Sequence, residues 1–162
     1  MRRNPVLKSW RQWAVGCAVG ALLAAGLPAP QEASAASAVV GSPMPPGAAR
    51  IWFYRNYEPY GSRNMAPVSL NGALVGYVQP DGSAFYRDVS PGRYHVTVAS
   101  DGTDVNQAKD VDLGPGQQAF VKILAATGWE TGGGSGSYAR DTFYVSLVPA
   151  QVAQGELSSR SQ

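Results

Sequence analysis

Short apolar segments, separated by turn residues about every ten positions, constrain the fold of this 162-residue chain more than any other feature. Such spacing is typical of antiparallel sheets whose consecutive strands are joined by tight turns. Asn71-Gly72 is a type I′ hairpin signal because both residues tolerate positive φ. Further turns combine proline with glycine, at Pro80-Asp81-Gly82, Ser90-Pro91-Gly92 and Gly114-Pro115-Gly116. This pattern excludes a helical bundle.

Eight strands are predicted between these turns. They span residues 50–55, 67–70, 73–79, 84–89, 93–100, 108–113, 119–125 and 142–148. Alternation places Tyr94, Val96 and Val98 on an inner face, with Arg93, His95 and Thr97 toward water, and likewise sets Val121 and Ile123 opposite Lys122. The predicted fold class is all-β, a single antiparallel β-sandwich of seven or eight strands with an N-terminal signal-peptide helix.

One predicted strand is apolar at every position. Ile51-Trp52-Phe53-Tyr54 cannot hide its side chains by facing a single core, because successive residues of a strand point to opposite faces. We therefore expect either a central strand covered on both sides or a strand that borders an aromatic surface patch.

The first 35 residues have the pattern of a signal peptide. Arg2, Arg3, Lys8 and Arg11 make the start positive, and an apolar run of 15 residues follows, from Trp13 to Leu27. This run is shorter than the ~20 residues that span a bilayer. Small residues up to Ala35 and Ala38 provide cleavage sites, and the alternative is an uncleaved anchor helix. The predicted organisation is a signal peptide over 1–35, a Pro/Ala-rich tether over 36–48, the sandwich over 49–148 and a tail over 149–162, with a short helix around Val152, Ala153 and Leu157.

Charge argues against nucleic acid as a partner. The full chain has a net charge of +2, but the leader holds four of its basic residues. Removing the leader leaves 9 basic and 10 acidic residues, so no basic surface remains to neutralise phosphates.

The single cysteine, Cys17, lies inside the apolar run. The mature chain is therefore expected to have no disulfide. Ala14-Val15-Gly16-Cys17 loosely matches a lipoprotein box, so a lipidated Cys17 is the alternative to a leader that makes the only membrane contact.

Catalytic and metal chemistry find little support. His95 is the only histidine, which disfavours zinc, haem and iron–sulfur centres, so no cofactor, metal site or catalytic residue is predicted. The acidic stretch from Asp101 to Asp112 offers oxygen ligands for Ca²⁺, but its spacing does not match a calcium loop. The alternative to a non-enzymatic protein is a small periplasmic hydrolase that uses His95 with a carboxylate.

Aromatic residues give the only candidate binding site. Trp52, Tyr54, Tyr57 and Tyr60 lie within nine positions, and Trp129 and Tyr138 flank the flexible loop expected at Thr131-Gly132-Gly133-Gly134-Ser135-Gly136-Ser137. Two long loops carrying such rings could contact an envelope protein or a glycan. Packing of the rings over a sandwich rim is the competing interpretation.

Several segments resemble the domain-of-unknown-function family 2846. They are Arg50-Ile51-Trp52-Phe53-Tyr54-Arg55, Pro67-Val68-Ser69-Leu70-Asn71-Gly72 with Val75-Gly76, Phe85-Tyr86, Val89-Ser90-Pro91-Gly92-Arg93-Tyr94-His95-Val96 and Gly116-Gln117-Gln118-Ala119-Phe120-Val121. The resemblance covers residues 50–124. It implies a short exported bacterial envelope protein with a transthyretin-like or carboxypeptidase-regulatory-like sandwich, and it implies no catalytic residues.

These observations together predict a secreted protein of the periplasm or outer envelope. Its expected role is that of a non-enzymatic accessory, binding or structural module that acts through aromatic and glycine-rich loops. The sequence does not identify the partner.

Overall fold

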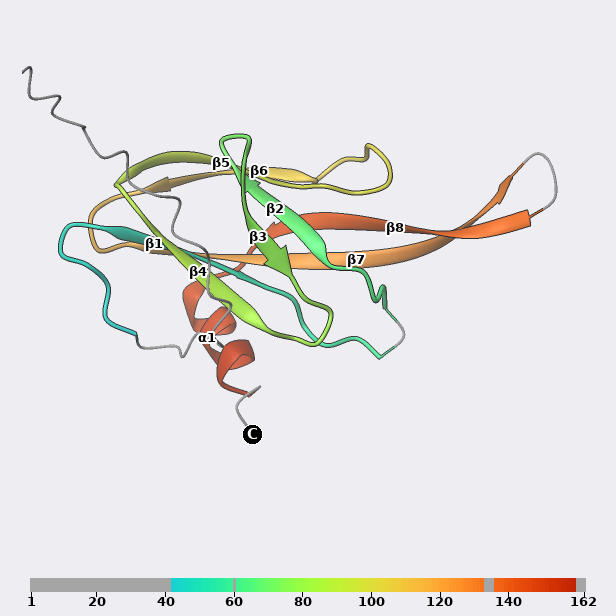
Figure 1. The fold of residues 1–162 in the computed structure, drawn as a ribbon. Helices are drawn as coiled ribbons and strands as arrows, with labels where there is room; N and C mark the ends of the chain where they lie inside the picture. The colour runs from blue at the N-terminus through green and yellow to red at the C-terminus, as the bar shows by residue number, and fades with distance from the viewer. Residues whose placement is uncertain (1–41, 60, 133–135, 160–162) are drawn as a thin grey trace, which may run out of the picture. The chain divides into compact units, whose positions relative to one another are not determined.

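The computed structural model describes residues 42–59, 61–132 and 136–159, which hold eight strands and one helix (Figure 1). The elements are β1 (Ala49–Tyr54), β2 (Ala66–Leu70), β3 (Ala73–Val78), β4 (Ala84–Val89), β5 (Gly92–Val98), β6 (Ala108–Leu113), β7 (Gln118–Gly132), β8 (Gly136–Leu147) and α1 (Ala150–Ser158). Each of the eight predicted strands is present, so the all-β prediction is confirmed. The predicted signal peptide and most of the tether lie outside the described residues.

The strands form two four-stranded sheets. Their orders are β4-β1-β7-β8 and β3-β2-β5-β6. All neighbouring strands are antiparallel except β1 and β7, which run parallel, with Arg50 opposite Gln118 and Tyr54 opposite Lys122. The prediction of purely antiparallel pairing was wrong here, because turn residues report only how strands adjacent in sequence are joined, whereas the whole second sheet separates β1 from β7 along the chain.

One hydrophobic core joins the two sheets. Ile51, Phe53, Val121 and Ile123 from the first sheet pack in the same cluster as residues of the second sheet. The second sheet contributes Val68, Val78, Val96, Val98, Val111 and Leu113. The predicted inner faces of β5 and β7 are therefore confirmed.

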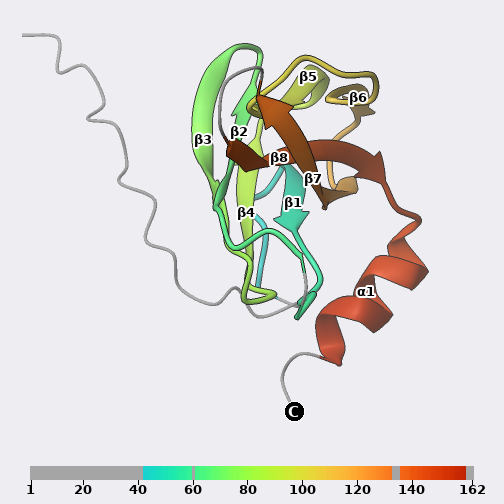
Figure 2. The same cartoon turned by 90° about the vertical axis from the view of Figure 1, so that its right-hand side faces the viewer.

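The outer face of β1 is covered by α1, which lies on the side of the first sheet away from β2 and β3 (Figure 2). Trp52 and Tyr54 pack with Phe120 of β7 and with Ala153 and Leu157 of α1 in a second apolar cluster. The helix has no side-chain cap and no charged residue in its end turns that would favour it, so this packing must stabilise it. β1 is thus the central strand covered on both sides that the sequence allowed.

Polar contacts fasten α1 to the same sheet. Glu156 of α1 accepts hydrogen bonds from the Tyr54 hydroxyl at 2.8 Å and from Lys122 Nζ at 2.6 Å. Burial raises the pKa of the Glu156 carboxyl, but its hydrogen bonds from Lys122, Tyr54 and Asn56 outweigh burial and leave that pKa below its ordinary value. The short helix therefore has both an apolar and a charged attachment.

β7 and β8 are much longer than predicted. They pair from Val121 opposite Leu147 to Gly132 opposite Gly136, whereas β1 accompanies β7 only to Lys122. The predicted flexible loop is therefore wrong at Thr131, Gly132, Gly136 and Ser137, which are strand residues, and Trp129, expected beside the loop, lies inside β7. Small residues weaken strand propensity, but an antiparallel partner in register supplies the backbone hydrogen bonds that compensate.

We call residues 126–132 of β7 and 136–141 of β8 the arm. In Figure 1 it extends past β2, β5 and β6 as a two-stranded ribbon. Ala126, Thr127, Gly128 and Trp129 are all exposed, although successive residues face opposite sides of the ribbon. Both faces of the arm are therefore uncovered along this part of β7.

No helix in the described part of the chain is long and apolar enough to cross a bilayer.

Candidate binding surface

The six aromatic residues predicted to bind do not form one surface. Trp52 and Tyr54 are buried beneath α1, at 1% and 0% exposure, so they stabilise the fold and are not accessible to a ligand. Tyr57 is exposed in the segment after β1, and Trp129 is 74% exposed on the arm. Tyr60 lies outside the described residues, and for Tyr138 only the place of its backbone in β8 is described. Trp129 and Tyr57 remain available for contact.

Trp129 lies on the core-facing side of the arm. Alternation along β7 puts Val121, Ile123, Thr127 and Trp129 on one face, and the first two are fully buried in the core. Trp129 continues this buried row past the point where the second sheet covers it. A large ring therefore occupies a core-type position that has no opposing layer.

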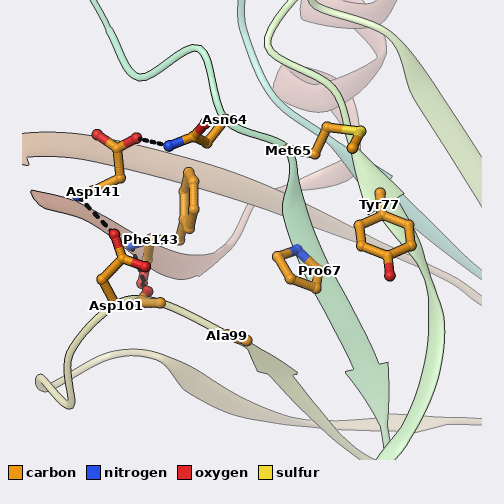
Figure 3. A pocket seen from close by; sticks show the side chains of 9 residues that line it. Asn64, Met65, Pro67, Tyr77, Ala99, Asp101, Asp141 and Phe143 are labelled. Atoms are coloured by element: carbon orange, nitrogen blue, oxygen red, sulfur yellow. Dashed lines mark hydrogen bonds between the residues drawn. The ribbon is translucent and has the colours of Figure 1, made fainter.

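A groove of about 380 Å³ lies at the base of the arm (Figure 3). Its lining comes from the segment before β2, from β2 and β3, from the segment after β5 and from the middle of β8: Asn64, Met65, Pro67, Tyr77, Ala99, Ser100, Asp101, Asp141 and Phe143. Figure 3 shows Tyr77 and Met65 toward one end and the two carboxylates at the other. Tyr77 is 48% exposed and Met65 50% exposed, so a ligand could contact both.

Asp141 organises the polar end of this groove. Its carboxylate, 8% exposed as a residue, accepts hydrogen bonds from Ser62 Oγ, from Asn64 Nδ2 at 2.7 Å and from Thr127 Oγ1 at 2.8 Å. Burial raises the pKa of this carboxyl, but the bonds from Ser62, Thr127 and Asn64, with the charge of Arg55, leave it below its ordinary value. Asp141 is therefore an anion that holds the arm to the segment before β2.

Arg55 donates hydrogen bonds to the backbone of the same segment before β2. Its side chain is buried, and its guanidinium donates to the carbonyl oxygens of Ser62 at 2.6 Å and Asn64 at 3.3 Å. Burial lowers its pKa, which the charges of Glu58 and Asp141 partly oppose. A buried arginine that donates mainly to main-chain oxygens fixes the path of the loop, so Ser62 and Asn64 are held against Asp141.

Asp101 is the exposed carboxylate of the groove. One of its oxygens accepts a weak hydrogen bond from the Asp141 backbone N–H at 3.4 Å, and its own N–H donates to the Asp141 carbonyl at 3.4 Å. Unlike the Asp141 carboxylate, it accepts no hydrogen bond from a side chain of the described residues. It is the carboxylate best placed to meet a ligand.

A second polar cluster lies on the outer face of the other sheet. His95 Nδ1 is 2.7 Å from Asp110 Oδ1, and Arg93 Nη2 is 2.7 Å from Asp110 Oδ2. The hydrogen bond with His95 and then that from Arg93 lower the pKa of the Asp110 carboxyl. All three side chains are about half exposed or more, and none of them lines the groove at the base of the arm.

A second hollow of about 570 Å³ lies beside the β8 edge and is lined mainly by Lys109, Leu124, Tyr144, Val145 and Leu147. Its polar groups already have partners: Lys109 Nζ donates to Asn106 at 3.0 Å, and the Tyr144 hydroxyl to Asp104 at 2.8 Å. It is the less polar candidate of the two.

The acidic stretch considered for Ca²⁺ is dispersed by the fold. Asp101 lies beside Asp141, Asp104 bonds Tyr144 and Asp110 bonds His95. Within residues 42–59, 61–132 and 136–159, no group of three or more His, Cys, Asp or Glu side chains is placed to hold a metal ion.

Sequence reasoning missed the groove itself. Tyr77 lay within a predicted strand to which no inner or outer face was assigned, and Asp141 stood at the edge of a predicted loop. The only available signal was a polar residue next to an apolar strand, which is too common to select a site.

No family model matches this chain, and no curated protein matches it. The resemblance to the domain-of-unknown-function family 2846 therefore stays a prediction.

Proposed function

We propose that this protein is an exported, non-enzymatic binding module of the bacterial envelope, a β-sandwich that binds a glycan in the groove beside Trp129. The proposal includes membership of family 2846 and a location in the periplasm or on the outer envelope. The observation that carries it is the groove, whose lining combines the half-exposed ring of Tyr77 toward one end with the carboxylate of Asp101 and the amide of Asn64 toward the other.

This combination suits a sugar. A pyranose has an apolar face of C–H groups that packs on an aromatic ring, and hydroxyl groups that donate to carboxylate and amide oxygens. Trp129 shares a strand face with Asp141 and Thr127, so it extends the surface beyond the groove. A chain of sugar units could contact Tyr77 first and Trp129 next.

The test is a titration of the purified protein with soluble fragments of envelope polysaccharide, followed by calorimetry. Tyr77→Ala and Asp101→Asn are each expected to weaken binding roughly tenfold or more, because they remove a central contact. Leu74→Ala is the matched control: Leu74 is also exposed on β3 but does not line the groove. Equal affinity for all three variants, or binding by an envelope protein in place of glycan, would contradict the proposal.

Export is tested separately, by determining the N-terminus and mass of the protein from its native cells. A chain that begins at Ala36 or Val39, without added lipid, supports the predicted cleavage. A lipid mass on Cys17, or an intact Met1, favours one of the anchored alternatives.

The His95–Asp110 contact supports a second candidate, the small hydrolase. A carboxylate on Nδ1 orients a histidine for general-base catalysis, and 2.7 Å is the distance such a pair needs. Hydrolysis of envelope esters or amides by the protein would have to disappear in His95→Ala and persist in Arg93→Ala, whose guanidinium bonds the same carboxylate. Equal activity in His95→Ala and the wild type would exclude this candidate.

A further inference from the structure

We propose that two copies of this chain pair through their arms. The distal edge of β7 joins the same edge of a second copy, antiparallel about a two-fold axis, so that the ribbons merge into one four-stranded sheet. This interaction uses a strand edge, not the groove, and so goes beyond the proposed function.

The direction of the backbone groups follows from β8. The N–H groups of Asp141, Phe143 and Val145 point away from β7, because they donate to Asp101 Oδ2, Ser100 Oγ and the Asn106 carbonyl. In an antiparallel pair, the backbone N–H and C=O groups of two directly opposite residues either both point toward the partner strand or both point away from it. Thr127, Trp129 and Thr131 pair with Asp141, Ala139 and Ser137, so their N–H and C=O groups point outward on the other edge.

The other strand edges in the described structure carry protective features. The edge strand β3 has a register shift opposite Val68 and Ser69 and receives the Arg87 guanidinium on its Val75 carbonyl, and the distal part of β8 carries Arg140 and Asp141. The base of β8 is capped by Ser100, Asp101 and Asn106, and β1 covers β7 up to Lys122. The edge strand β4 carries Arg87 and Asp88, and β6 carries Lys109, Asp110 and Asp112. Charges of this kind discourage pairing with another chain.

The distal edge of β7 lacks these protections. Among the described residues, no hydrogen bond reaches the outward backbone groups of Thr127 or Trp129. Residues 127–132 read Thr-Gly-Trp-Glu-Thr-Gly, with one charged residue, no lysine and no proline. An open strand edge of this composition is a template for another strand.

A second copy is the occupant that this edge fits. Antiparallel pairing of an edge with itself is self-complementary, since every donor of one copy meets an acceptor of the other. An axis through Gly128 sets Thr127 opposite Trp129 and each Glu130 opposite Ala126 of the second copy, so the like charges do not face each other. An isolated two-stranded ribbon is only marginally stable in water, whereas a sheet of three or more strands can be stable by itself. Pairing of two arms would therefore stabilise both.

Paired proline variants test the edge. Thr131→Pro and Ser137→Pro remove outward N–H groups at directly opposite positions of one arm, the first on the β7 edge and the second on the β8 edge. In sedimentation velocity of protein purified from cells expressing the full chain, we expect a concentration-dependent dimer. Thr131→Pro should raise its dissociation constant roughly tenfold or more, and Ser137→Pro should leave it unchanged.

A cysteine at the axis gives an independent readout that does not depend on a proline. In a Cys17→Ala background, Gly128→Cys places two sulfurs across a non-hydrogen-bonded pair, where Cα atoms lie about 4.5 Å apart, within the range of a disulfide. A side chain at Gly128 meets no atom within 4 Å, so the fold accepts it. We expect a disulfide-linked dimer from Gly128→Cys and none from Ser137→Cys.

A monomer at every concentration, equal effects of the two prolines, or equal cross-linking of the two cysteines would overturn the proposal. The emission of buried Trp52 reports whether each variant is folded. Tyr77→Ala should dimerise like the wild type, so a failure of glycan binding and a failure of arm pairing are distinguishable.

Discussion

Trp52 and Trp129 lie in the same four-stranded sheet, yet their side chains are 1% and 74% exposed. Trp52 is on the outer face of β1, where α1 supplies a covering layer, and its Nε1 donates to Gln118 Oε1 at 2.8 Å. Trp129 is on the core-facing side of β7, where the second sheet has already ended. Burial of an aromatic residue therefore depends here on the reach of the opposite layer, not on which face of the sheet the residue occupies.

The two regions also differ in how they are held. Trp52 is surrounded by rings, with the centroid of Tyr86 at 4.9 Å and that of Phe120 at 6.3 Å. The arm is held at its base by the hydrogen bonds of Asp141, and its two strands pair with each other from there to Gly132 and Gly136. Apolar packing should thus dominate the stability of the first region and polar contacts that of the second.

Replacing the covered tryptophan should have the largest effect. Trp52→Ala is expected to lower the free energy of unfolding by about 3–5 kcal/mol, because it leaves a large cavity between β1 and α1. Urea unfolding followed by circular dichroism measures this. A loss below about 1 kcal/mol would show that α1 does not seal this face.

Removing the covering layer's main anchor should come next. Leu157→Ala is expected to cost about 2–4 kcal/mol and to release α1, since Leu157 is 5% exposed against Trp52 and its neighbours. Val152→Ala is the matched control, because Val152 is half exposed on the same helix. Equal losses of unfolding free energy in the two variants would mean that the packing of Leu157 does not anchor α1 to the sheet.

The base of the arm should be sensitive to pH. The pKa of Asp141 is below its ordinary value in the folded protein, so its contribution to stability is present above the unfolded pKa and is lost as pH falls through the folded pKa. Asp141→Asn is expected to cost about 1–3 kcal/mol at neutral pH and to flatten the decline of stability in acid.

Unfolding curves of wild type and variant between neutral pH and strong acid test this, with exposed Asp112→Asn as the charge-matched control. Glu156 also has a lowered pKa and changes stability with pH in the same direction. The informative quantity is therefore the difference in unfolding free energy between the wild type and Asp141→Asn at each pH. Parallel curves would exclude Asp141 as a source of the acid sensitivity.

The smallest effect on stability is expected at the uncovered tryptophan. Trp129→Ala should change the free energy of unfolding by less than about 0.5 kcal/mol, as for exposed residues in general. It should nevertheless weaken glycan binding, which calorimetry measures. A large loss of stability would show that Trp129 is covered in solution by another layer.

Much of the fold could be predicted from the sequence. Alternation in β5 and turn residues such as Asn71-Gly72, where Asn71 has φ of 50° and Gly72 of 82°, identified the strands and their order along the chain. The candidate surface could not be predicted in the same way. Tyr77, Asp101 and Asp141 are far apart in sequence and line one groove only because the fold brings the end of β3 and the segment after β5 beside the middle of β8.

The sequence by itself determined the elements of this protein: eight strands and apolar positions on both faces of β1. These are local properties, set by residue type and spacing. The tertiary structure alone decided the parallel pairing of β1 with β7, the burial of Trp52 and Tyr54 beneath α1, and the extension of β7 and β8 into the arm. Those outcomes depend on which distant segment supplies the next strand or covering layer, and no local pattern encodes that choice.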